Sequence, residues 1–148
     1  MTIATAAFAG SFLIVTQRSI YADCQDEAAR FKWIESEKAG RDLGETAMRC
    51  WVKDHWWGYL RARWLEHLQG KCFWIELDRG DYGLLQRAFQ DQRVLLDDIL
   101  DRLKDGQENL DIIAWAVRSN IPLEPVIEIL EALDINSRRL VHQFDCLR

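Results

Sequence analysis

The chain has 148 residues, a length that suits one domain with a core large enough to need no disulfide or metal staple. Its composition, 49% hydrophobic and 29% charged, excludes a wholly disordered chain. The net charge of −5 is uneven, because residues 1–75 carry 10 Lys and Arg against 9 Asp and Glu, whereas residues 76–148 carry 9 against 15. The acidic second half is therefore a poor ligand for nucleic-acid phosphates.

Residues 1–20 are an apolar N-terminal arm or strand. No charged side chain occurs from Met1 to Thr16, and the run Phe12 to Val15 suits a short strand. The segment lacks the basic start of a secretory signal, and it is shorter than the ~20 apolar residues that span a bilayer. We therefore expect no transmembrane segment here. A membrane-surface anchor or an insertion into a partner remains the alternative.

Residues 23–77 form a tryptophan-rich half. Asp23 is a plausible N-cap for a helix over Cys24 to Ala39, which Gly40 ends. After a second, longer helix, Cys72 to Leu77 reads either as a short strand or as a helical turn, since short apolar runs are ambiguous. As a strand it could pair with Phe12 to Thr16.

The second helix, Glu45 to Gln69, is the most informative segment. Gly44 and Gly70 bracket it, and it contains four of the seven tryptophans. Placed at 100° per residue, its apolar side chains fall on two nearly opposite stripes, whereas a surface helix normally has one. Two stripes indicate a helix sandwiched between neighbours, or one with a side left for another chain.

Residues 84–148 form an acidic helical half. Apolar side chains recur at steps of three and four residues from Leu84 to Lys104, which predicts one long amphipathic helix. Further helices are predicted over Leu110 to Ser119, over Pro125 to Leu133, and after a cap at Asn136 or Ser137, where Leu140, Val141, Phe144 and Leu147 would face inward. The whole chain, residues 1–148, is thus predicted as a single all-α domain, an irregular bundle of five or six helices, with a possible minor two-stranded β edge.

The candidate catalytic and metal-binding residues are few. His55 and His67 lie twelve residues apart, ~18 Å along a straight helix, so one ion cannot bind both. The sequence has no hydrolase, zinc-protease or phosphate-loop motif, and its four cysteines include no CxxC pair. We expect no cofactor, no metal and reduced cysteines in a cytoplasmic protein. An enzyme or metal protein with Glu and His ligands is retained as a second alternative.

The basic residues of the second helix suggest a nucleic-acid alternative. Arg49, Lys53, Arg61 and Arg63 interleave with tryptophans, and indoles stack on bases while Arg and Lys bind phosphate. Such a protein would bind single strands. A helix-turn-helix reading of residues 112–129 is disfavoured, because Glu124, Glu128 and Glu131 would face the DNA phosphates.

Protein partners are the better-supported prediction. Trp and Arg are enriched at interface hot spots, and one small core can hardly bury every indole of this chain. The chain is therefore interpreted as a non-catalytic interaction module, an adaptor or a small subunit of a larger assembly. Its partner would be another protein or a second copy of itself, held by the residues Trp56, Trp57, Arg61, Arg63 and Trp64.

Overall fold

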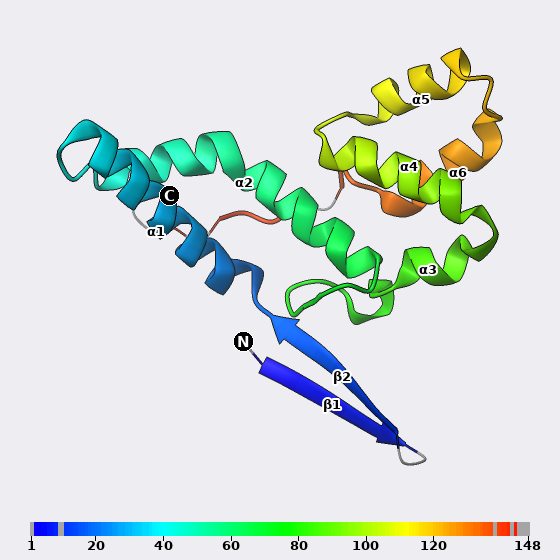
Figure 1. Cartoon of the computed structure of the whole chain (residues 1–148), viewed down its shortest axis with the longest axis horizontal. Helices are drawn as coiled ribbons and strands as arrows, with labels where there is room; N and C mark the ends of the chain where they lie inside the picture. The colour runs from blue at the N-terminus through cyan, green and yellow to red at the C-terminus, as the bar shows by residue number, and fades with distance from the viewer. Residues whose placement is uncertain (1, 9–10, 138, 143, 145–148) are drawn as a thin grey trace.

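The computed structural model describes residues 2–8, 11–137, 139–142 and 144. In this part of the chain six α-helices and three short strands are present, which confirms the all-α fold class with a minor β edge. Figure 1 shows a long helical hairpin on one side, a cluster of shorter helices on the other, and a strand hairpin that projects from the body. None of the described helices combines the length and the apolar character needed to cross a membrane.

The β edge has three strands rather than two. Strand β1 (Thr2–Phe8) pairs antiparallel with β2 (Ser11–Arg18), from Thr2 opposite Gln17 to Phe8 opposite Ser11. Strand β2 then pairs in parallel with β3 (Phe73–Trp74), so the expected contact between the N-terminal segment and residues 72–77 is present over two residue pairs. The arm or strand predicted over residues 1–20 is thus two paired strands, and the division was not predicted because the alanines of β1 give no alternating pattern.

Helices α1 (Ile20–Ala39) and α2 (Glu45–Leu68) form the long hairpin. Helix α1 begins four residues earlier than predicted, because Ser19 rather than Asp23 is its N-cap and accepts a hydrogen bond from the Ala22 amide at 3.2 Å. The Glu76 carboxylate also accepts the Ile20 amide at 2.7 Å, which places a negative charge at the positive end of the helix. The predicted bounds of α2 agree with the structure to one residue.

The second half contains η1 (Arg79–Asp81), α3 (Leu84–Ala88), η2 (Gln90–Gln92), α4 (Arg93–Lys104), α5 (Asn109–Arg118) and α6 (Leu123–Leu133). The single helix predicted from Leu84 to Lys104 is therefore wrong. It is interrupted at Phe89, whose backbone leaves the helical region, and a short 3₁₀ turn follows before α4 begins. The interruption lets α3 and α4 take different directions (Figure 1).

The helix predicted after Asn136 is also wrong for the residues that the structure describes. Residues 135–137 form a turn, and residues 139–142 and 144 have no regular secondary structure. This segment returns to the first hairpin, where the Leu140 carbonyl accepts the Trp56 indole N–H at 3.0 Å and the Val141 carbonyl accepts the Tyr21 hydroxyl at 3.0 Å. Val141 is exposed rather than inward, whereas Phe144 is buried against Trp51, and Leu147 lies outside the described residues.

Two hydrophobic cores share helix α2. The C-terminal part of α2 packs with α3 to α6, in a cluster that includes Trp64, Leu68 and Leu100. The middle of α2 packs with α1, β3 and Phe144, in a cluster that includes Trp51 and Trp56. Helix α2 thus contributes to two cores at different points along its length.

Candidate functional site

Adjacent tryptophans of α2 have opposite environments. Trp56 is 2% exposed and its indole N–H donates to the Leu140 carbonyl. Trp57 is 47% exposed, although it follows Trp56 directly. Consecutive helical residues point about 100° apart, so a helix at the edge of a core can bury one side chain and expose the next.

The two other tryptophans of the predicted contact set, Trp56 and Trp64, need correction. Trp56 and Trp64 are each 2% exposed, and the Trp64 indole N–H donates to the Leu133 carbonyl at 2.9 Å. Both rings fill the core and both polar tips are satisfied, so neither offers an anchor at the surface. They were assigned to the contact because the sequence does not show which of the two stripes is covered. Of the three predicted tryptophans, Trp57 is the one that faces solvent.

A groove of about 360 Å³ lies beside Trp57. Three separate segments build it: α2, the start of α5 and the turn after α6. Its lining residues are Trp57, Leu60, Arg61, Trp64, Glu108, Ile135, Asn136 and Arg139. Apolar and polar side chains line the groove in equal number, four of each, so it can offer both kinds of contact to a binding partner.

Arg139 is the rim residue that sequence reasoning missed. Its guanidinium carbon lies 4.8 Å from the centroid of the Trp57 ring, a cation–π arrangement, and its Nε–H donates to the Asn136 carbonyl at 3.0 Å. No carboxylate of the described residues pairs with it. Because 82 positions separate Arg139 from Trp57, no local pattern could have linked the two.

Arg61, a predicted contact residue, holds the groove together. Its Nη2 donates to both carboxylate oxygens of Glu108, at 2.8 and 2.9 Å, and Nη1 donates to the Gln107 carbonyl at 3.4 Å. This bidentate pair joins α2 to the connection between α4 and α5. Arg61 therefore lines the groove, but its charge is already paired.

Arg63 lies away from the groove. Its Nε donates to Glu66 at 2.7 Å, a second nitrogen is 3.6 Å from Glu27 of α1, and its guanidinium covers the Tyr59 ring at 4.9 Å. These contacts tie α2 to α1 and shield aromatic core, so Arg63 is a structural residue here and its assignment to the contact needs correction.

The remaining residues of the nucleic-acid set lie near the start of α2. Arg49 is 3.5 Å from Glu45, whereas Lys53 is exposed and forms no ion pair with a described residue. Three of the four predicted phosphate-binding residues are therefore neutralised by carboxylates, and Lys53 is left as the free charge.

His67 is buried at the centre of an aromatic cluster. Its Nδ1 accepts the Trp74 amide at 3.2 Å, so its Nε2 carries the hydrogen and donates to the Asp78 carbonyl at 2.7 Å. Phe73 and Tyr82 pack edge-on against its ring. Burial lowers the pKa of His67 below 6.5, because the charged form would lose its hydration. His67 is thus a neutral structural group that fastens β3 and the following turn to α2.

The cysteines differ in environment. Cys24 and Cys72 are buried, and burial raises the pKa of the Cys24 thiol to about 11. Cys50, by contrast, is exposed. The described residues contain no group of three or more His, Cys, Asp or Glu side chains placed to bind a metal ion.

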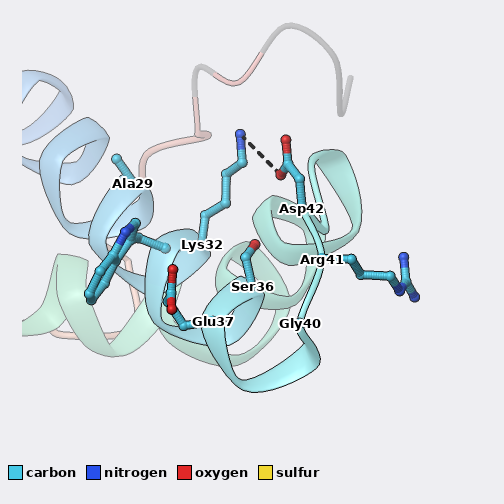
Figure 2. Close-up of a pocket in the computed structure, with 8 residues that line it drawn as sticks. Ala29, Lys32, Ser36, Glu37, Gly40, Arg41 and Asp42 are labelled. Carbon is cyan, nitrogen blue, oxygen red and sulfur yellow. Dashed lines mark ion pairs between the residues drawn. The ribbon is translucent and has the colours of Figure 1, made fainter.

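A second, larger depression of about 660 Å³ lies at the far end of the first hairpin. It is lined by the last turns of α1 and by the turn to α2, and Trp33, 65% exposed, borders it. Figure 2 shows Lys32 reaching across to Asp42, an ion pair of 3.7 Å, while Arg41 points away. Its charged rim is thus partly paired within itself, and no other segment closes it.

Comparisons with known proteins give no further guide to the role of this chain. No family model, no curated protein and no solved structure matches it.

Proposed function

We propose that this protein is a non-catalytic interaction module, an adaptor or small subunit, that binds a protein partner or a second copy of itself through the groove beside Trp57. The observation that carries the proposal is the half-exposed indole of Trp57 at the edge of a groove built from three segments. Trp in a pocket ringed by Arg is the usual composition of an interface hot spot. The reduced cysteines suit a cytoplasmic setting.

The groove also indicates what the partner presents. Trp57 offers apolar surface, and Arg139 offers a guanidinium without a carboxylate partner among the described residues. The complementary element is an apolar side chain with a carboxylate close by. Rim charges of this kind select the partner and its orientation more than they add affinity.

The nucleic-acid alternative gains no support from these contacts. Single-strand binders need several free cations along a path, and here Arg49, Arg61 and Arg63 each face a carboxylate. The enzyme alternative has no favourable observation either, because the buried His67 has both ring nitrogens occupied by the main chain.

Matched indole variants test the proposal. We would express the tagged chain in its cells of origin, together with the variants Trp57→Ala and Trp33→Ala. Proteins that co-purify with each tagged chain in a fixed molar ratio are then quantified. Truncating one hot-spot side chain costs about 2 kcal/mol, which weakens binding roughly 30-fold. Trp57→Ala should lose the companion, whereas Trp33→Ala, which removes an indole outside the groove, should keep it.

Equal retention by both variants would place the contact elsewhere than the groove. Loss in Trp33→Ala alone would move the interface to the far end of the first hairpin. An Arg139→Glu variant adds a second check that spares the core, because Arg139 is exposed. It should weaken the complex by reversing the free charge on the rim.

A further inference from the structure

Helices α5 and α6 carry more apolar surface than their own core uses. Each buries one face completely, through Ile112 and Ala116 on α5 and through Val126 and Ile129 on α6. Each also exposes a second apolar row, and these exposed side chains are Leu110, Val117, Leu123 and Ile127. Leu110 is 79% exposed, so the second row has no cover within the described chain.

A groove of about 320 Å³ runs between the two helices. Ile113 of α5 and Ile127 and Leu130 of α6 supply its apolar lining, and Asn109, Glu131, Asp134, Ile135 and Asn136 complete it. Helix α6 has 11 residues and is therefore ~16 Å long, about three turns. The groove follows the second half of α6, from Ile127 onward, and the turn after it. A groove lined in this way by helix side chains can take the apolar stripe of another helix.

Among the described residues, two acidic side chains, Glu131 and Asp134, and no basic one line this groove. Glu124, Glu128 and Glu131 follow one another at steps of four and three residues, so they form one row along α6 beside Ile127. All three are exposed, and none forms an ion pair with a described residue. Residues 105–137 contain seven Asp and Glu against one basic residue, Arg118. The surface around the groove is therefore strongly negative.

We propose that the groove between α5 and α6 binds a basic amphipathic helix of a partner protein. The apolar stripe of that helix packs on Ile113, Ile127 and Leu130, and its Lys and Arg side chains pair with the glutamate row. Charge complementarity fixes the class of partner, because a row of free carboxylates repels nucleic acid and anionic lipid alike. This groove adjoins the one beside Trp57, since Ile135 and Asn136 line both, but the contacts proposed for it use other residues.

The side chain of Asn109 supports an incoming polar group. It lines the groove, and its Oδ1 is shielded from water without a hydrogen-bond donor among the described residues. Leaving a buried acceptor without a hydrogen-bond donor costs free energy. A lysine or arginine of the docked helix can supply the donor once the Asn109 side chain turns toward the groove.

The test uses synthetic peptides and the full chain. The probe is a helix-forming peptide of about 20 residues with Leu at helical spacing and Lys on the remaining face, and its control has every Lys replaced by Glu. Binding is measured by fluorescence anisotropy of the labelled peptide, and the contact is mapped by amide chemical shifts of the protein. The Lys peptide should bind and shift residues of α5 and α6, and the Glu peptide should not bind.

Matched protein variants distinguish binding at this groove from non-specific attraction of the peptide to the acidic surface. Glu124→Lys with Glu131→Lys should weaken binding about tenfold or more, and Ile127→Asp should weaken it similarly by disrupting the apolar contact. Asp97→Lys with Asp98→Lys makes the same charge change on exposed residues of α4 that do not line the groove, and binding should persist. Circular dichroism verifies that each variant is folded.

Three results would overturn the proposal. Equal weakening by the two double charge reversals would show long-range attraction without a site. Chemical shifts confined to other helices would place the contact elsewhere. A concentration-dependent dimer of the wild-type chain that Ile127→Asp abolishes would show that a second copy occupies the groove instead of a basic helix.

Discussion

Truncation of the two adjacent tryptophans of α2 should have very different effects on stability. Trp56→Ala removes a fully buried indole, for which the loss of burial and the resulting cavity together cost about 3–5 kcal/mol. It also leaves the Leu140 carbonyl without its donor. Trp57→Ala removes a ring that is 47% exposed. About half of a large side chain's burial energy is lost together with one exposed cation–π contact, so we expect about 1–2 kcal/mol.

Urea unfolding followed by far-UV circular dichroism measures both values on the isolated chain. We expect a large shift of the urea midpoint for Trp56→Ala and a small shift for Trp57→Ala. The slope of the free energy of unfolding against urea concentration should be the same in both variants. Equal losses would refute the environments assigned to the two rings, and a larger loss for Trp57→Ala would mean that Trp57 belongs to the core. The second result would also remove the basis of the proposed interface.

Two further predictions concern titration and reactivity. Burial lowers the pKa of His67 below 6.5, so the folded state binds fewer protons than the unfolded chain between the two pKa values. The free energy of unfolding should therefore be highest above pH 6.5 and fall below it, by at most about 1.4 kcal/mol per pH unit. His67→Gln should remove the fall and His55→Gln, which changes an exposed histidine, should keep it; a flat profile for the wild type would contradict the neutral assignment. In a Cys146→Ser background, a thiol reagent should label the exposed Cys50 in the folded chain and reach the buried Cys24 only on unfolding, and rapid labelling of Cys24 would contradict its burial.

The long helices could be predicted because their signals are local. Gly44 and Gly70 both adopt positive φ angles, at 54° and 74°, and they bracket α2 where the sequence placed its ends. The two apolar stripes of α2 were only partly informative, because Trp57, which lies on one of them, is 47% exposed. By contrast, the side chains before and after Phe89 continue one helical stripe, and no Gly or Pro marks the interruption there.

The site depended on contacts that no local pattern records. Trp56 is buried against Tyr21 of α1 and donates to the Leu140 carbonyl, which lies 84 positions away in the sequence. The same C-terminal segment supplies Arg139 to the groove. Residues that look like a helix by periodicity therefore adopt an irregular conformation, because main-chain carbonyls there accept hydrogen bonds from distant side chains. Arg61 was predicted from composition alone, and its role as a clamp on Glu108 became visible only in three dimensions.

The native mass of the particle that contains this chain tests the proposed interaction with a partner most directly. It is measured by native mass spectrometry after gentle purification from the protein's own cells. An interaction module should be found in a complex of defined stoichiometry, heavier than the 17.4 kDa of the single chain, and Trp57→Ala should release the chain from it. A chain that runs as a free 17.4 kDa monomer at its cellular concentration would contradict the proposed function.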